Sequence, residues 1–507
     1  MPAFVAGGGR DSMPALKHLH RQAEAPDYGI APFWTQRRPE AYRPSQAAAS
    51  ALRSAGLILG DVLAFLVIVA LVRLVAEGVG YPIWPAGVAA DPAMLTKEAA
   101  VVLAAALIYM LAHGHYRRRL PYWFELRQVI EAAGLAAVCS GVVAFTSTGH
   151  ASDVVLIAPW LLFPIAVMAA RSLVRRALEA IGVWRLPVVL VGSERDVRQA
   201  GEALRSEPRL GYDVVGVVSH IPNASLRAAQ RWVGAMREHN AELLVIAFGV
   251  EDRPGAAQME ALVRERIPFA VMPQLQGLPV FGSVQTAFVS HDTMLVSYNN
   301  NLSKPLARAV KVSFDLAGAA AALLMLSPLL LIIAALVKCD GGPVVFSHTR
   351  IGAGGRPFRC LKFRSMVLNG DEVLQRLLET DPAAAAEWAA TQKLHDDPRV
   401  TWIGNLLRKS SLDELPQLFN VLRLEMSLVG PRPIVQREIQ KYAEDIAYYY
   451  ETRPGLTGLW QVSGRSDTSY AQRVQLDSWY VKNWTLWQDM AILARTIPAV
   501  LKQKGAV

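Results

Sequence analysis

The sequence has 507 residues, of which 52% are hydrophobic and 19% are charged, and its formal net charge is +9. This composition is too apolar for an ordinary soluble enzyme and predicts a membrane protein. The positive charge suits a cytoplasmic membrane face with anionic lipid, or a phosphorylated substrate. Because no motif that reads nucleic acid is found, nucleic acid is not an expected partner. The three cysteines have no pairing or metal-binding spacing, which argues against disulfides and zinc sites.

Residues 1–52 are rich in Gly, Pro, Ala and Arg without periodicity, and we expect them to form a disordered cytosolic tail. Residues 53–175 contain four apolar runs, each a candidate transmembrane helix. Arginines cluster before the first run, between the second and third, and after the fourth, so both ends of this four-helix bundle should be cytoplasmic. The runs are Ala55–Val75, Lys97–Ala112, Val129–Ser147 and Val154–Ala170.

Asp61 is a charged residue inside the first apolar run. Charges at membrane depth are costly and often mark proton or ion paths. Because no chain of intramembrane ionisable groups accompanies Asp61, we favour a structural role, either at the interface or paired with a neighbouring helix.

Residues 186–295 change to short β-rich runs separated by helical ones, which predicts a small parallel α/β domain. The turn after its first strand, Val191–Arg195, lacks the G-x-G-x-x-G spacing that a dinucleotide needs. We therefore expect a spacer, dimerisation or regulatory role instead of cofactor binding. The predicted strands are Pro187–Val191, Asp213–Ser219, Glu242–Phe248 and Pro268–Pro273.

A fifth apolar stretch, Val312–Val337, is interrupted by Ser327 and Pro328. Proline removes a backbone donor and kinks a helix, and a serine hydroxyl can bond to a carbonyl that is freed. Lysine and arginine flank both ends, so the positive-inside rule places the two ends on the same membrane face. This pattern favours a re-entrant helix over 311–338 that breaks at the Ser-Pro pair. A kinked fifth transmembrane helix is the alternative.

Two β-rich runs, Pro343–Ile351 and Pro357–Phe363, are joined by a glycine cluster at 352–355. A hairpin turn explains the glycines better than a phosphate loop, because no helix start follows them. Alternation puts Lys362 and Arg364 on one face of the second strand, where two cations could meet a diphosphate. A solvated basic face is the alternative.

Residues 405–433 place the carboxylate pair Asp413 and Glu414 between closely spaced cations. Pro416 favours a helix that begins close to it, so the pair would lie at a helix N-terminus, which attracts phosphate. An ionised Asp413 could attack phosphorus, and Glu414 could hold a metal or handle a proton. A capping box from Ser411 to Glu414 is the alternative. The cations are Arg408, Lys409, Arg423 and Arg432.

Several longer motifs accompany this pair in a fixed order: Lys362–Met366, residues 405–433, Arg453–Gly458 and Gln461–Arg465. On these motifs the C-terminal part resembles the catalytic domain of bacterial sugar transferases, the monotopic phosphoglycosyl transferases. More narrowly, the whole chain is similar to undecaprenyl-phosphate galactose phosphotransferases of the WbaP type. The resemblance implies a Rossmann-like α/β middle domain and an α+β catalytic domain over 304–507 that carries the re-entrant helix.

The same resemblance implies a reaction and the residues that perform it. Asp413 would be the nucleophile and Glu414 its partner, both associated with Mg²⁺. Hexose 1-phosphate would pass from a UDP-hexose, with galactose favoured and glucose open, to undecaprenyl phosphate, which begins the synthesis of O-antigen, capsule or exopolysaccharide. We expect a homodimer among the lipids of the bacterial inner membrane, with a cytoplasmic catalytic domain; a non-catalytic membrane scaffold is the alternative. The resemblance also implies that four cations contact phosphate or nucleotide: Lys362, Arg408, Arg432 and Arg465.

Two further patterns lie in the C-terminal part. Residues 371–393 read as one helix. Tyr480, Trp484 and Trp487 have the i, i+4, i+7 spacing of one helical face. Such a stripe fits either a membrane interface or buried core packing.

Overall fold

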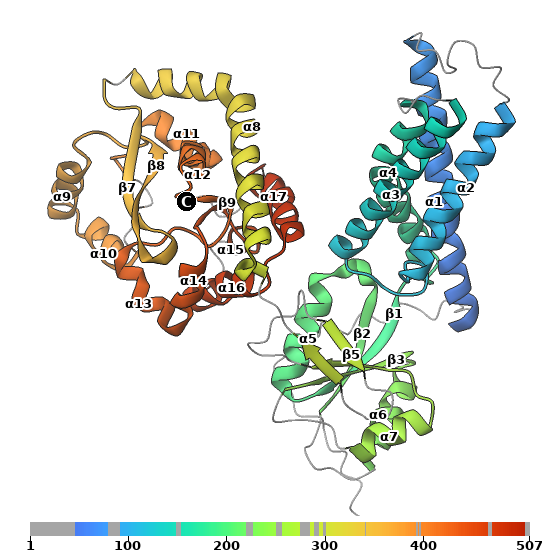
Figure 1. Cartoon of the computed structure of the whole chain (residues 1–507). Helices are drawn as coiled ribbons and strands as arrows, with labels where there is room; N and C mark the ends of the chain where they lie inside the picture. Colours follow the sequence, from blue (N-terminus) through green and yellow to red (C-terminus); the bar gives the residue numbers. More distant parts are fainter. Residues whose placement is uncertain are drawn as a thin grey trace, which may run out of the picture. The chain divides into compact units, whose positions relative to one another are not determined.

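A computed structural model shows the chain folded as two compact units (Figure 1). Unit 1 comprises Met1–Tyr122 with Val129–Pro273, and unit 2 comprises Trp123–Gln128 with Gln274–Val507. Most of the predicted tail, up to residue 45, lies outside the described residues. The prediction is wrong for residues 46–52, which are helical and form the start of the first apolar helix. The structure describes residues 46–79, 92–148, 154–219, 227–249, 256–273, 284–287, 294–297, 301–339, 341–391, 394, 397–464 and 469–501.

Four helices among the described residues are long and apolar enough to cross a membrane. Three of them, α1 (Gln46–Gly78), α3 (Tyr122–Thr148) and α4 (Val154–Ala180), cover predicted apolar runs. The fourth is α8 (Pro305–Lys338), which covers the interrupted stretch. The apolar part of α2 (Pro92–Ala112) is shorter. By length and composition, the predicted membrane character is confirmed.

Asp61 of α1 pairs with Arg171 of α4, and both side chains are fully buried. The guanidinium Nε lies 2.9 Å from Oδ1, and a terminal guanidinium nitrogen lies 2.6 Å from Oδ2. The Tyr116 hydroxyl donates to Oδ2 at 2.8 Å. Both carboxylate oxygens thus have partners, as a buried charge requires. The predicted structural role of Asp61, pairing with a neighbouring helix, is confirmed.

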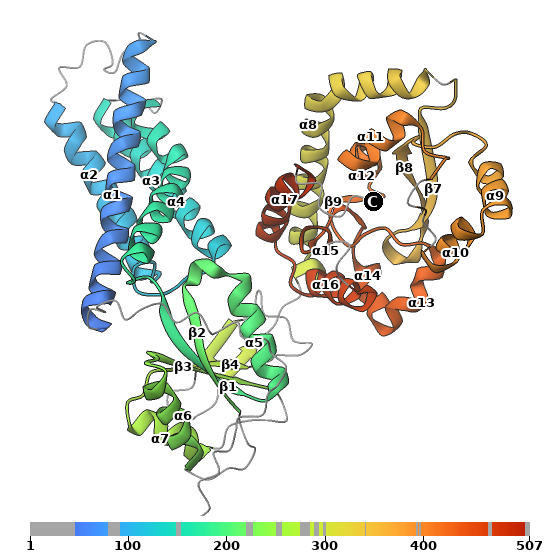
Figure 2. The ribbon, with the colours of Figure 1, turned by 180° about the vertical axis from the view of Figure 1, so that it is seen from behind.

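The middle part of the chain forms a parallel sheet whose strands begin and end within a residue of the predicted runs. Helix α5 (Glu194–Ser206) packs on one face, and α6 (Arg227–Glu238) and α7 (Ala256–Arg264) pack on the other, as Figure 2 shows. The strand over Leu186–Gly192 supplies side chains to both faces of the sheet, which explains its unbroken apolar sequence. The spatial order is β2 (Tyr212–Ser219), β1 (Leu186–Gly192), β3 (Leu243–Phe248) and β4 (Phe269–Pro273).

Helix α8 contains Pro328 and bends sharply along its length (Figure 1). Pro328 has no N–H to donate to the carbonyl of Leu324, four residues earlier. The Ser327 hydroxyl donates to that carbonyl instead, at 2.8 Å. The apolar side chains of Leu324, Met325 and Leu331 around the proline are exposed. A bent helix with an exposed apolar tip has the form that a re-entrant helix requires, although re-entrance itself stays a prediction.

In unit 2, β7 (Val345–Ile351) and β8 (Pro357–Phe363) pair as an antiparallel hairpin. Gly354 and Gly355 in the turn have φ of +65° and +76°, a region that favours glycine. The predicted hairpin is therefore confirmed, and the alternative phosphate loop is wrong.

The core of unit 2 lies among α8, the β7–β8 hairpin and three C-terminal helices, and Val421, Met426 and Val429 at its centre have no exposed surface. The pair of short parallel strands β9 (Ser427–Val429) and β10 (Gly455–Thr457) crosses this core. The three helices are α12 (Gln417–Leu422), α16 (Tyr470–Lys482) and α17 (Leu486–Leu501). Further elements of this unit are β5 (Val284–Ala287), β6 (Met294–Ser297), α11 (Trp402–Ser410), α13 (Ile439–Tyr442), α14 (Ile446–Glu451) and α15 (Leu459–Val462).

The single helix predicted over 371–393 is wrong. The structure has two helices there, α9 (Gly370–Thr380) and α10 (Pro382–Thr391). Proline favours the first turn of a helix, and the Asp381 carboxylate accepts hydrogen bonds from the backbone of that turn, at 2.9 and 3.2 Å. A new helix therefore starts where the sequence pattern appeared continuous.

The aromatic stripe does not lie on one helix. Tyr480 belongs to α16, Trp484 lies in the connection, and Trp487 belongs to α17. Tyr480 and Trp484 are only 1% and 4% exposed. For these two residues, core packing is the correct alternative.

Candidate active site

The carboxylate pair lies in the short connection between α11 and α12. Ser411 ends α11 in the left-handed region, with φ of +57°, and its N–H donates to the Arg408 carbonyl. One 3-10 turn, Leu412–Glu414, then carries Asp413 and Glu414 towards α12. The Ser411 side chain makes no capping hydrogen bond, so the alternative capping box is wrong.

Lys362 of β8 joins the two carboxylates. Its Nζ lies 3.3 Å from Oδ2 of Asp413 and 2.8 Å from Oε1 of Glu414. Asp413 is buried, and the other two side chains are half-buried. Helix α12 begins at Gln417, directly after Pro416, as predicted. One cation is thus shared between two anions in a place with limited access to water.

The charges of Lys362, Asp413 and Glu414 influence the pKa values of Lys362 and Asp413. Burial raises the pKa of the Asp413 carboxyl above its usual value, although the Lys362 ammonium opposes this effect. Burial alone would lower the pKa of Lys362, but Glu414 and Asp413 outweigh it and the pKa is raised. The ammonium is therefore charged at neutral pH, and its charge favours the ionised carboxylate that attack on phosphorus needs.

Arg408 lies at the exposed edge of this group, on α11. Its Nε donates to the Ser365 hydroxyl at 3.1 Å. Its charge favours the ionised form of Asp413, though less than the charge of Lys362 does. A phosphate in solution could reach Arg408 from this side. The predicted site residue Arg465 lies outside the described residues.

Arg364 contacts the C-terminal end of helix α8. It is buried, and its guanidinium donates to the Val337 carbonyl in the last turn of α8 at 3.0 Å. Strand alternation predicted Arg364 beside Lys362, but β8 ends at Phe363 and the next side chain binds a helix end. Cations interact favourably with helix C-termini, so this contact fixes α8 against the hairpin.

Arg432 lies in the Pro-Arg-Pro loop that follows β9. Its guanidinium carbon is 5.7 Å from the centre of the Trp460 ring. The loop is held to β10 by a backbone bond from the Gly455 N–H to the Pro431 carbonyl, at 2.8 Å. The charge of Arg432 opposes protonation of Lys362, which places both cations in one electrostatic neighbourhood.

A second group of charged residues beside Arg432 was missed by sequence reasoning. Arg350 of β7 lies 3.9 Å from the Glu438 carboxylate, and Arg473 of α16 lies 3.7 Å from the same carboxylate. The register of the hairpin could have identified Arg350, because Arg350 and Lys362 lie on the same face of the two paired strands. No local pattern marks Arg473, which comes from a distant helix.

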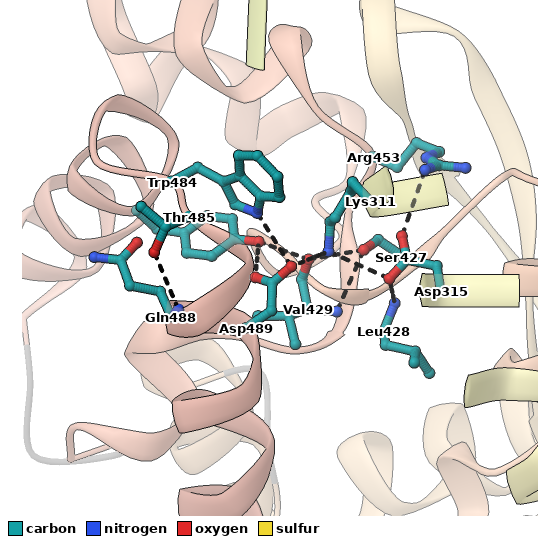
Figure 3. Close-up of polar contacts among 11 residues, drawn as sticks. Lys311, Asp315, Ser427, Leu428, Val429, Arg453, Trp484, Thr485, Gln488 and Asp489 are labelled. Atoms are coloured by element: carbon teal, nitrogen blue, oxygen red, sulfur yellow. Dashed lines mark hydrogen bonds and ion pairs between the residues drawn. The ribbon is translucent and has the colours of Figure 1, made fainter. Parts of the chain in front are cut away.

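A buried ionic network fixes β9, the strand that leads into the Pro-Arg-Pro loop (Figure 3). Lys311 of α8 lies 2.7 Å from the Asp489 carboxylate of α17 and 3.3 Å from the Asp315 carboxylate. The ammonium also donates to the Val429 carbonyl at 3.0 Å, and the Leu428 N–H donates to Asp315 at 3.2 Å. Two helices are thus tied to one short strand by charge-assisted hydrogen bonds.

The carboxylate pair is the candidate metal site. Within the described ranges, no group of three or more His, Cys, Asp or Glu side chains converges. Asp413 and Glu414 supply two carboxylates, and Mg²⁺ is commonly held by one or two carboxylates together with substrate phosphates. The donor set therefore fits Mg²⁺ that is bound with a phosphate-bearing substrate, and it does not fit a zinc cage.

Comparison with known proteins places this site in a family. Residues 306–503, which include every site residue described above, match the family described as bacterial sugar transferase. The UDP-galactose-lipid carrier transferase of Erwinia amylovora is 40% identical over 77% of this chain and 84% of the relative. The undecaprenyl-phosphate galactose phosphotransferase of Salmonella typhimurium is 39% identical over the same shares, 77% and 84%. The UDP-glucose:undecaprenyl-phosphate glucose-1-phosphate transferase of Escherichia coli is 30% identical over 71% and 77%. The chain belongs to the bacterial sugar transferase family.

Proposed function

We propose that this enzyme transfers hexose 1-phosphate from a UDP-hexose to undecaprenyl phosphate and releases UMP, as the initiating step of surface polysaccharide synthesis. The observation that carries the proposal is the Lys362 ammonium shared by Asp413 and Glu414, inside the stretch that matches the family. A nucleophile, a second carboxylate and cations for phosphate are the groups that this chemistry needs.

Galactose is the favoured sugar. The two relatives that match 77% of the chain at 40% and 39% identity carry galactose in their names, whereas a relative named for glucose that matches a similar share, 71%, is 30% identical. A second relative named for glucose is 41% identical, but over only 38% of the chain. Glucose is the competing donor, because the site residues described above are proposed to bind phosphate, and none of them is proposed to distinguish the two hexoses.

The proposed reaction consists of two displacements at one phosphorus. A carboxylate oxygen of Asp413 attacks the phosphorus that bears the sugar; the bond to the bridging oxygen breaks, and UMP leaves with that electron pair. A phosphate oxygen of undecaprenyl phosphate then attacks the same phosphorus, and Asp413 leaves as a carboxylate. Lys362 and Arg408 stabilise the negative charge on the transferred group, and Arg432 binds the diphosphate of the donor. Two steps suit substrates that come from different phases, one from water and one from lipid.

Membrane arrangement is part of the proposal. We infer that the bundle over 53–175 anchors the chain in the inner membrane, that α8 enters and leaves the cytoplasmic leaflet, and that 304–507 works on the cytoplasmic side. Ser327 and Pro328 would form the break in α8, and the exposed apolar side chains around them support this arrangement. A homodimer is the proposed assembly, with the domain over 186–295 as a spacer or dimerisation element.

A panel of donors tests the function. Purified protein is incubated with undecaprenyl phosphate and UDP-galactose, UDP-glucose or UDP-N-acetylhexosamines, and UMP release is recorded. We expect release with UDP-galactose above all others. Release with UDP-glucose alone would correct the sugar, and no release with any UDP-hexose would contradict the proposed reaction.

Magnesium dependence is the next expected outcome. Glu414 together with Asp413 would hold Mg²⁺, and bound Mg²⁺ would supply charge neutralisation for the diphosphate. We expect EDTA to abolish UMP release and added Mg²⁺ to restore it. Independently of turnover, Mg²⁺ should raise the thermal stability of the wild-type complex with UDP, and the Glu414→Gln variant should lose this effect. Full UMP release in EDTA would contradict the prediction.

Replacing Lys362 by methionine should shift the acid limb of the pH profile of kcat/KM to higher pH. Asp413 must be ionised to attack, and the Lys362 charge lowers the raised pKa of this buried carboxyl. Without the ammonium the pKa rises further, so activity is lost at a higher pH as the pH falls. At pH 7 we expect a loss of about a hundredfold. Lys362→Arg is the control that keeps the charge; an unmoved acid limb in Lys362→Met would contradict the coupling.

A further inference from the structure

Two guanidinium groups lie against the Trp460 ring in cation–π contacts. Arg432 lies with its guanidinium carbon 5.7 Å from the ring centre, and Arg473 lies at 5.1 Å. Arg432 follows β9, and Trp460 belongs to α15, which follows β10. Because β9 and β10 pair in parallel, their C-terminal ends lie at one edge, and this brings the arginine onto the indole.

Arg473 is buried, and nearby carboxylates compensate its charge, although its Nε and one terminal nitrogen have no hydrogen-bond partner within the described residues. It lies 3.7 Å from Glu438 and 3.8 Å from Asp477, and its guanidinium carbon is 5.1 Å from the Tyr470 ring. The Tyr442 hydroxyl donates to the same Asp477 carboxylate at 2.7 Å. Glu438 and Asp477 thus both have Arg473 as an ion-pair partner, and Asp477 also accepts a hydrogen bond from Tyr442.

Arg432 has a different environment. Glu438 is shared by Arg350 and Arg473, and within the described part of the chain Arg432 forms no ion pair with a carboxylate. A carboxylate partner would neutralise the guanidinium, whereas an aromatic face holds a cation and leaves its charge available. Flanking prolines restrict the backbone of the loop, which limits the entropy lost when Arg432 binds an anion.

We propose that Trp460 is a positioning residue that presents the charged Arg432 to the diphosphate of the nucleotide-sugar donor, with Arg473 as the buried cation that pairs with Asp477 in place of Arg432. This inference rests on the proposed function and extends it to a residue that touches neither the carboxylate pair nor Lys362 in the contacts described above. Trp460 acts on donor binding and not on the chemical step.

Kinetics of Trp460→Leu test the inference. We expect the KM for the UDP-sugar to rise about five- to tenfold with kcat changed less than about twofold, as the loss of one cation–π contact predicts. Trp460→Phe keeps an aromatic face and should recover most of the loss. Tyr448→Leu is the matched control, because it removes another cation–π contact of the same domain, to Lys482 at 4.3 Å; its KM should stay at the wild-type value.

A double-mutant cycle shows whether Trp460 acts through Arg432. In the Arg432→Gln background, Trp460→Leu should add little further increase in KM. UDP binding to the Asp413→Asn protein gives a readout without turnover, and adding Trp460→Leu should weaken the dissociation constant by the same factor. Additive effects, or a fall in kcat at unchanged KM, would overturn the positioning role. Wild-type protein that binds UDP but releases no UMP would overturn the proposed reaction alone, and protein that does neither would overturn both.

Discussion

Asparagine in place of Asp413 should lower UMP release by at least about four orders of magnitude, as expected for the loss of a catalytic nucleophile. The amide oxygen is a poor nucleophile, whereas the size and shape of the side chain stay almost the same. Asp413 is 8% exposed and lies 3.3 Å from the Lys362 ammonium, to which an amide oxygen can still bind. The fold should therefore remain, and an unchanged melting temperature would show that only chemistry was lost.

Intact-mass spectrometry makes this expectation specific to the covalent route. Wild-type protein incubated with the donor alone should gain the mass of one hexose phosphate, and Asp413→Asn should gain none. Asp371→Asn is the matched control, because Asp371 is an exposed aspartate of the same domain. Product formation by wild-type protein that never shows an adduct would contradict the covalent intermediate, and so would full activity of Asp413→Asn.

The centre of the site could be predicted because its parts are local in the sequence. Asp413 and Glu414 are neighbours, and proline sets the start of the helix after them. Lys362 lies next to the end of a strand, and the glycine turn and the alternation along this strand fix both the hairpin and the face of the side chain. These patterns could not show that the Lys362 ammonium contacts both carboxylates, since that contact spans about fifty residues.

Arg364 shows the limit of what local sequence patterns can predict. Its spacing from Lys362 was correct for one strand face, but its side chain binds the end of α8, which is close to it only in the folded chain. The aromatic stripe failed for a related reason. Periodicity does not reveal that α16 ends at Lys482, so Tyr480 and Trp487 belong to different helices.

The contacts around Arg432 were beyond prediction because they come from three separate elements. Trp460 follows β10, Arg473 belongs to α16, and Glu438 lies after the Pro-Arg-Pro loop. The parallel pairing of β9 with β10, short strands with no pattern of their own, brings Trp460 to Arg432, and the packing of α16 adds Arg473. Tertiary packing, not propensity, decides such contacts.

Replacing Lys311 by methionine should cause a large loss of stability in the catalytic domain, about 3–5 kcal/mol. The ammonium lies 2.7 Å from Asp489 and 3.3 Å from Asp315, and both of these side chains are fully buried. Methionine fills a similar volume but leaves two carboxylates without their shared cation. For a domain of this size, the melting temperature should fall on the order of 10 °C.

The cause can be separated from a general packing defect by a compensating variant. Burial already raises the pKa of Asp489 even with Lys311 beside it, so removal of the carboxylate charge should relieve most of the penalty. Lys311→Met combined with Asp489→Asn should therefore regain several degrees, because Asp315 keeps the Leu428 N–H and Arg453 at 3.4 Å as partners. Lys338→Met at the exposed far end of α8 is the control and should melt like the wild type. If the double variant is no more stable than Lys311→Met, an unpaired buried charge is not the source of the loss, and β9 is not held by this ionic network.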